Sequence, residues 1–196
     1  NTKMMPLDKA PQTWMDLTKP EYKAKVLIAN PAQSGSGYSQ MIQIVQLYGW
    51  EVMDKIVGVA TFVTSSRLAY QNVAKGEVPV GLTSEFNILA SKVDGFPVEA
   101  VYPKDGTALI NDASGIIKGG PNLENARRFV DFINSREAHS VAAGKPFFRR
   151  SVRKDVAPPP GLRSTAEIKF FDYDVEKAAR EKAANLKKFD EILAAK

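Results

Sequence analysis

Short apolar runs rich in β-branched residues alternate with helical patterns along most of this chain, and this alternation limits the fold more than any other feature. The run from Lys25 to Ala29 (K-V-L-I-A), bounded by Asn30 and Pro31, predicts a buried strand. Residues 61–63 and 78–82 predict two more strands. Strands that alternate with helices indicate an α/β domain with a largely parallel sheet.

Helical patterns follow these runs. The first has apolar residues on one face and ends at Gly49, a second covers about 51–57, and a third begins at Thr64 to Ser66 and ends at Gly76. Further strands are predicted at 98–102 and 108–118, further helices at 122–133 and 136–143, a loop at 144–165, and a long helix at about 174–194.

The composition is that of an ordinary folded protein. Of 196 residues, 44% are hydrophobic and 25% are charged, and no stretch approaches the roughly 20 apolar residues that a membrane helix needs. We therefore expect no membrane insertion. The absence of cysteine excludes disulfides and thiol chemistry within this sequence. Because the sequence begins at Asn1 without an initiator methionine, we interpret its start as a cut edge.

The net charge of +5 raises the question of nucleic-acid binding. The basic residues are spread along the chain, and the densest cluster (Arg149, Arg150, Arg153 and Lys154) has only two aromatic neighbours. This pattern does not favour nucleic acid as a partner. A basic protein that captures small anions accounts for the same charge.

Three strand-to-helix or strand-to-loop junctions carry small polar residues. In an open α/β sheet such junctions gather at the carboxyl ends of the strands, where ligands bind. A Ser-Gly-Ser-Gly sequence that opens a helix offers backbone N–H groups, hydroxyls and the positive end of the helix dipole, which together suit an anion. The candidate ligand-binding residues are Ser34, Gly35, Ser36, Gly37, Tyr38, Thr64, Ser65, Ser66, Thr83 and Glu85.

Each junction also has a simpler interpretation. Serine and threonine are good helix caps, and glycine-rich turns often serve backbone geometry alone. Glu85 could accept hydrogen bonds from ligand hydroxyls or an amine, or could be a solvated surface carboxylate. The residues alone leave these alternatives open.

Signatures of catalysis are missing from the sequence. His139 is the only histidine, and we find no nucleophile elbow, no phosphate loop and no pair of residues with metal-ligand spacing. We therefore predict a binding protein rather than an enzyme, with no catalytic residue, metal or cofactor.

Several stretches together resemble the periplasmic solute-binding proteins of ABC transporters, in the branch that includes ferric-iron, phosphonate and sugar-phosphate binders. The likeness keeps its order over nearly the whole chain. The matching stretches are Pro11 to Leu17, Pro20 to Lys23, Asn30 to Gly37, Val73 to Val78, Tyr102 to Thr107, and Asn125 to Phe132.

This resemblance implies the type II-like fold of periplasmic binding proteins, in which two α/β lobes hold a ligand between them. It implies a hinge crossing at 1–24, the second lobe at 25–118, and helical segments at 119–196 that return to a first lobe that is mostly absent. The final helix would then expose Leu186, Phe189 and Leu193. Since exposed apolar faces find partners, we expect association with the missing lobe or with a second copy.

The resemblance also bears on the ligand. Ferric-iron members carry adjacent tyrosines where this chain has Thr83-Ser84-Glu85-Phe86, so iron is not expected. The resemblance implies a periplasmic or lipid-anchored extracellular protein that delivers a small anionic solute, such as a sugar phosphate or a phosphonate, to an ABC permease. The alternative is an interaction partner of a membrane sensor, or a self-associating fragment without transport activity.

Overall fold

A computed structural model describes residues 1–196, which form two compact units: residues 1–109 with 163–196, and residues 110–162. The first unit is built on a sheet in the order β2-β1-β3, with β1 at Val26–Ala29, β2 at Thr61–Val63 and β3 at Val80–Gly81. Both outer strands run parallel to β1. The predicted α/β class with a parallel sheet is confirmed.

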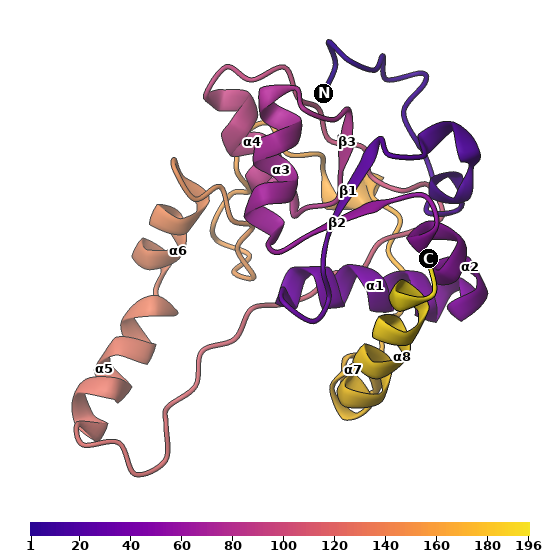
Figure 1. Cartoon of the computed structure of the whole chain (residues 1–196). Helices are drawn as coiled ribbons and strands as arrows, with labels where there is room; N and C mark the ends of the chain where they lie inside the picture. Colours follow the sequence, from indigo (N-terminus) through magenta and orange to yellow (C-terminus); the bar gives the residue numbers. More distant parts are fainter. The chain divides into compact units, whose positions relative to one another are not determined.

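Two helices cover one face of this sheet. Helix α1 (Gly35–Tyr48) and helix α2 (Trp50–Val57) pack on each other (Figure 1). Their apolar side chains share a core with Val26 and Ile28 of β1. All four residues of β1 are buried, as expected for a strand that is covered on both faces.

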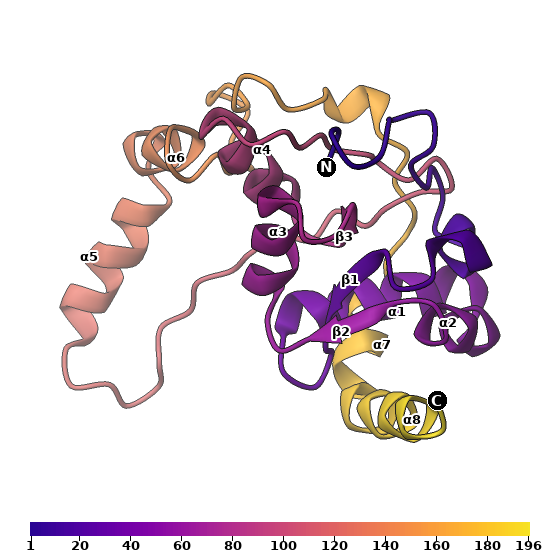
Figure 2. The ribbon, with the colours of Figure 1, turned by 45° about the horizontal axis from the view of Figure 1, so that its top comes forward.

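Helices α3 (Ser66–Lys75) and α4 (Glu85–Val93) cover the opposite face, and α3 contacts β1 directly. Val73 and Ala74 of α3 pack with Val98 and Ile88 in a smaller cluster. The first unit is therefore a three-layer α/β/α structure (Figure 2). Helix α4 was not predicted from the sequence, although Phe86, Leu89, Ala90 and Val93 have helical spacing.

The predicted long C-terminal helix is divided at Glu181 into α7 (Val175–Arg180) and α8 (Lys182–Ala194). The prediction that its apolar face is exposed is wrong. Phe189 is fully buried, with its ring 5.1 Å from the ring of Phe62 on β2, and Leu186 and Leu193 pack against the same core. The apolar face of α8 thus packs within the first unit.

The strands predicted at 98–102 and 108–118 are not formed. Instead, residues around Thr107 pair with the returning segment around Phe170 in an isolated parallel bridge. The backbone N–H of Thr107 donates to the carbonyl of Lys169 at 2.9 Å, and Gln43 of α1 accepts from the backbone N–H of Ala108 at 2.8 Å. One helix therefore supports the pair of segments that lead out of this unit and back into it.

The N-terminal segment is irregular, with short 3-10 turns η1 (Met15–Thr18) and η2 (Pro20–Tyr22). Trp14 and Leu17 are both buried and anchor this segment. The Trp14 indole N–H donates to the carbonyl of Gly106 at 2.7 Å, which attaches this segment to the turn before Thr107.

The second unit, residues 110–162, contains α5 (Leu123–Ile133) and α6 (Arg136–Ala143), which contact each other. Both helices were predicted. Ser135 caps α6 by accepting a 3.2 Å hydrogen bond from the N–H of Ala138. His139 Nδ1 lies 2.7 Å from the hydroxyl of Ser151. The two units have chain boundaries near 110 and 162. The hinge crossing at 1–24, the lobe at 25–118 and the returning segments at 119–196 stay a prediction.

Candidate functional site

The three polar junctions follow three neighbouring parallel strands. Ser34 follows β1, Ser65 follows β2, and Thr83 follows β3. Since all three strands run in the same direction, their carboxyl ends, and therefore the N-termini of α1, α3 and α4, lie along one edge of the sheet (Figure 1). In open α/β sheets this edge is where ligands bind.

At the central junction, Ser34 caps α1. Its backbone is extended, and its hydroxyl accepts a 3.2 Å hydrogen bond from the N–H of Gly37. The N–H groups of Gly35 and Ser36, in the first turn, have no carbonyl four residues earlier within the helix. They point out of the helix start together with its positive dipole end, an arrangement that suits an anion.

Gly37 has a packing role at the same junction. A Cβ built on this residue would lie 2.3 Å from the carbonyl oxygen of Ala29. Only glycine therefore lets the first turn of α1 approach the end of β1 this closely. At Gly35 a Cβ would meet no atom within 4 Å, so that residue faces open space.

Tyr38 is placed in the core. It is buried, its hydroxyl donates to the carbonyl of Ala178 at 2.5 Å, and it accepts from the side chain of Asn185 at 3.3 Å. These contacts attach α7 and α8 to α1. Among the residues predicted at this junction, Tyr38 therefore stabilises the packing of the C-terminal helices.

At the second junction, Ser65 caps α3 by accepting a 3.3 Å hydrogen bond from the N–H of Leu68. Thr64 is exposed and Ser66 is half-buried. The first-turn N–H groups of Ser66 and Arg67 extend the pattern found at α1. Capping and anion binding are compatible here, because the serine occupies only one of the N–H groups at each helix start.

The third junction is built differently. Ser84 precedes α4 but makes no side-chain cap, and Thr83 accepts a 2.9 Å hydrogen bond from the amide of Asn87. Glu85 is the first residue of α4, and its Oε2 accepts a 2.6 Å hydrogen bond from the hydroxyl of Tyr102. Glu85 is half-buried and hydrogen-bonded, which differs from a freely solvated carboxylate.

Two residues near Glu85 were not singled out from the sequence. The ring of Tyr102 lies under the guanidinium of Arg163, whose carbon is 5.0 Å from the ring centroid. Arg163 comes from the returning segment, 61 positions after Tyr102 by their numbers. A contact over this separation leaves no local pattern in the sequence, so the contact between Tyr102 and Arg163 could not be predicted from it.

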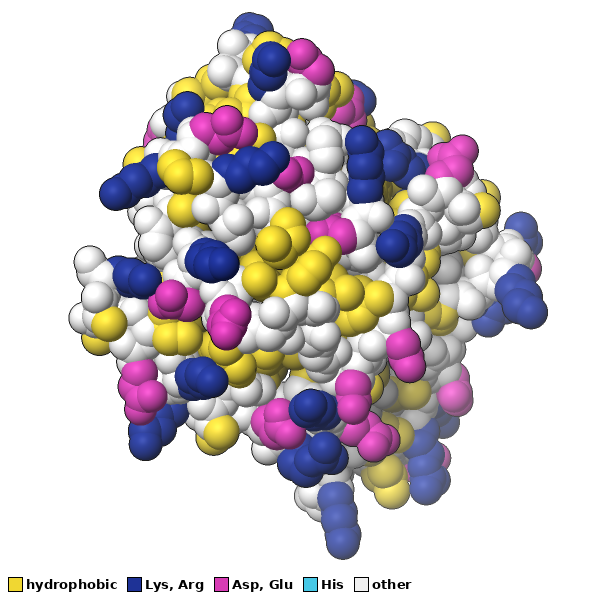
Figure 3. Space-filling model, turned by 90° about the vertical axis from the view of Figure 1, so that its right-hand side faces the viewer, with side chains coloured by type: hydrophobic (Ala, Val, Ile, Leu, Met, Phe, Trp, Pro, Cys, Tyr) yellow, Lys and Arg dark blue, Asp and Glu magenta, His cyan; other side chains and the backbone are white.

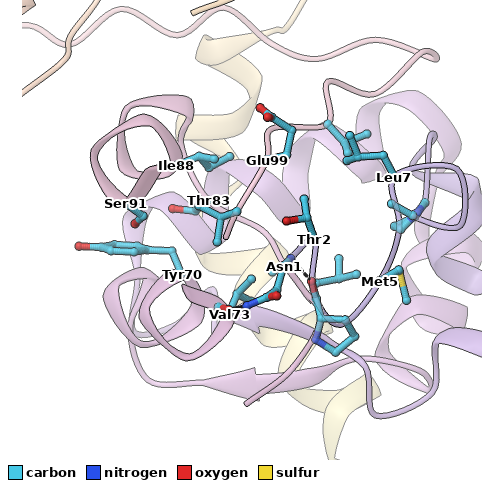
Figure 4. A pocket seen from close by; sticks show the side chains of 17 residues that line it. Asn1, Thr2, Met5, Leu7, Tyr70, Val73, Thr83, Ile88, Ser91 and Glu99 are labelled. Carbon is cyan, nitrogen blue, oxygen red and sulfur yellow. Dashed lines mark hydrogen bonds between the residues drawn. The ribbon is translucent and has the colours of Figure 1, made fainter. Parts of the chain in front are cut away.

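A cavity of about 90 Å³ lies between the N-terminal segment and α3, β3 and α4 (Figure 4). Its walls are mainly apolar, and Thr83 is the one predicted site residue that lines it. Ligand pockets for small molecules usually measure several hundred Å³. The cavity is therefore too small to be the binding site for a sugar phosphate.

No group of three or more His, Cys, Asp or Glu side chains is arranged to hold a metal ion in residues 1–196. None of the helices combines the length and the apolar character needed to cross a membrane. On the face seen in Figure 3, Lys and Arg side chains are interspersed with Asp and Glu, without a broad field of one sign.

Comparison with known proteins decides the family. Residues 1–189 match the model of the bacterial extracellular solute-binding protein family. The chain belongs to this family.

Relatives of this solute-binding chain support the assignment. An uncharacterized Haemophilus influenzae protein is 30% identical over 177 residues, which is 87% of this chain and 51% of that protein. The Escherichia coli spermidine/putrescine-binding periplasmic protein is 26% identical over 164 residues, or 76% of this chain and 46% of its own length. The chain thus spans about half the length of these curated relatives.

A solved structure agrees with the fold. The periplasmic binding protein AfuA from Actinobacillus pleuropneumoniae, with fructose-6-phosphate bound, superposes with a TM-score of 0.88 at 29% identity, covering 98% of this chain and 63% of AfuA. The fold is therefore that of periplasmic binding proteins, as the sequence analysis predicted.

Proposed function

We propose that this chain belongs to the substrate-binding component of an ABC transporter, and that it captures a small solute with an anionic phosphate or phosphonate head. The observation that carries this proposal is the row of three helix N-termini, from α1, α3 and α4, along one edge of the parallel sheet. The first-turn N–H groups at Gly35, Ser36, Ser66 and Arg67 would hold the anionic oxygens, and the serine hydroxyls would add donors.

The polar tail of the solute would lie toward Glu85. Its carboxylate accepts hydrogen bonds, so it suits a ligand that offers hydroxyl or amino groups. AfuA, whose likeness covers 98% of this chain, has fructose-6-phosphate bound, and this supports a phosphorylated solute.

The proposed protein acts by binding and not by catalysis, in the periplasm or on the outer face of a membrane. Its partners would be the solute and an ABC permease. The periplasmic names of its relatives support this location. An interaction partner of a membrane sensor is the alternative, and such a protein would bind no small anion.

A thermal-shift and calorimetric screen tests the proposal. The ligands are hexose phosphates, phosphonates, sulfate, spermidine and ferric iron. A ligand at a hundred times its Kd stabilises the folded state by about 2.7 kcal/mol. We expect a shift with phosphorylated ligands, and the Ser36→Ala variant should weaken their binding, because the Ser36 hydroxyl is a proposed donor.

The Ser34→Ala and Ser65→Ala variants lose helix caps and need a matched control. Ser135→Ala removes a cap of the same geometry from α6, outside the three junctions, at a similar cost of about 1 kcal/mol. Anion binding should weaken in the first two variants and stay unchanged in the third. Binding of spermidine or iron with no response to anions would contradict the proposal.

A further inference from the structure

Two glutamines of α1 are equally buried but differently bonded. Gln40 and Gln43 each keep 7% of their surface exposed. The Oε1 of Gln43 accepts hydrogen bonds from the hydroxyl of Thr107 at 3.0 Å and from the backbone N–H of Ala108 at 2.8 Å. The Oε1 of Gln40 is buried and has no hydrogen-bond partner within the protein. Gln40 therefore holds an unused acceptor inside the folded structure.

An unpaired acceptor at Gln40 lowers the stability of the folded protein. A buried polar atom loses its hydrogen bonds to bulk water on folding, and without a new partner this loss is not compensated. An apolar side chain of the same shape would avoid the cost. Packing alone therefore does not account for a glutamine at this position, whereas a donor that arrives with a ligand does.

The position of Gln40 on α1 places it beside the candidate anion site. Ser36, Gln40 and Gln43 are spaced i, i+4 and i+7, so they lie along one face of the helix. Side chains of an α-helix lean towards its N-terminus, so the side chain of Gln40 covers the turn that contains Ser36. The carboxamide thus lies next to the first turn of α1, whose N–H groups are the proposed donors to the anion.

The carboxamide of Gln40 complements these N–H groups chemically. Backbone N–H groups only donate, whereas a sugar phosphate also carries hydroxyl groups that need an acceptor. The last torsion of a glutamine side chain is broad, so the Gln40 oxygen can turn towards such a hydroxyl. Because the carboxamide is neutral, it does not repel the nearby phosphate as a carboxylate would.

We propose that Gln40 is a further ligand-binding residue, and that its Oε1 accepts a hydrogen bond from a hydroxyl close to the phosphate of a sugar phosphate. Gln40 determines specificity by favouring hydroxylated phosphate esters over the bare phosphate anion. This inference rests on the proposed function, because it assigns a further contact in the same binding site.

Isothermal titration and thermal unfolding of the full-length gene product test the role of Gln40. The ligands are fructose 6-phosphate and inorganic phosphate. Gln40→Met replaces the carboxamide with an apolar side chain of similar length. It should weaken the binding of fructose 6-phosphate about tenfold and that of inorganic phosphate by less than about twofold. The Tm of the free protein should stay the same or rise, because an unpaired buried acceptor is removed.

A matched control comes from α3. Gln71→Met makes the same change at a half-buried position in the middle of that helix, away from its N-terminus. It should change neither affinity. A glutamine-to-methionine substitution would then weaken sugar phosphate binding only at residue 40.

The outcomes separate this inference from the proposed function. If the wild type binds neither anion, the proposed function fails and the role of Gln40 fails with it. If the wild type binds fructose 6-phosphate, three results overturn only the role of Gln40: equal affinity in Gln40→Met, equal weakening of both anions, or a lower Tm of the free variant. Binding of inorganic phosphate alone by the wild type also overturns it.

Discussion

The phenolic hydroxyl of Tyr48 donates a 2.8 Å hydrogen bond to Oδ2 of Asp105, and the same oxygen accepts from the backbone N–H of Trp14 at 2.8 Å. These two bonds join the end of α1, the turn before Thr107 and the N-terminal segment. The other carboxylate oxygen of Asp105 is buried without a protein partner, so this connection between the three segments depends on Oδ2 alone.

Replacing Tyr48 with phenylalanine should therefore lower the free energy of unfolding by about 1–3 kcal/mol, because the half-buried carboxylate of Asp105 loses one of its two partners. Urea denaturation of Tyr48→Phe and the wild type gives this difference. A loss below about 0.5 kcal/mol would show that the hydrogen bond between Tyr48 and Asp105 does not stabilise the folded protein.

The same bond predicts a dependence on alkaline pH. Burial, followed by Asp105, raises the pKa of Tyr48 to about 12 from its ordinary value of 10.0. The stabilising contribution is therefore complete below about pH 10 and is lost as pH rises through 12. Tyr48→Phe should lack this part of the pH dependence of Tm.

Gly37 and Gly35 form a matched pair of positions on one helix turn. Gly37→Ala would place a methyl group 2.3 Å from the carbonyl oxygen of Ala29, and we expect a loss of about 3 kcal/mol or more. Gly35→Ala meets no atom within 4 Å and should change stability by less than about 1 kcal/mol. Equal effects in chemical denaturation would contradict the close approach of α1 to β1.

Substitution of Phe189 tests whether α8 packs against the sheet. Because its side chain is fully buried against Phe62, Phe189→Ala should cost about 3–5 kcal/mol. Val175 on α7 is 59% exposed, and Val175→Ala should cost less than about 0.5 kcal/mol. A small effect at Phe189 would mean that α8 leaves this core in solution.

Asp16 should contribute to acid stability. Burial opposes its ionisation, but hydrogen bonds from Lys19 and from the backbone near Gln12 and Thr13 outweigh that effect and lower its pKa to about 2. The contribution is complete above about pH 4 and is lost as pH falls towards 2. Melting temperatures between pH 2 and 6 should fall more steeply for the wild type than for Asp16→Asn.

The sequence predicted the sheet and the helix starts well, because these depend on local patterns. β1 and β2 lie where strands were expected, and Ser34 and Ser65 cap the helices that follow them. Their parallel order then brings the candidate junctions to one edge. Whether these residues bind an anion is still a prediction.

The errors came from long-range packing. Val98 is buried as its apolar run indicates, but the run from 98 to 102 pairs with no strand, because apolar character reports burial and not backbone pairing. The face of α8 was expected to be exposed, yet Phe189 packs on β2, a contact that spans 127 positions between Phe62 and Phe189. The Tyr102–Arg163 contact escaped prediction for the same reason.

Calorimetric titration of fructose 6-phosphate into the wild type and into Ser36→Ala tests most directly whether the N-terminus of α1 binds the anion. Ser36 lies in the first turn of α1 and is not its cap, so this change removes a proposed donor without the cost of a lost cap. We predict saturable single-site binding by the wild type, and binding that is at least tenfold weaker in Ser36→Ala, with no change in the Tm of the free protein. Binding of equal strength in both proteins, or no binding by the wild type, would contradict it.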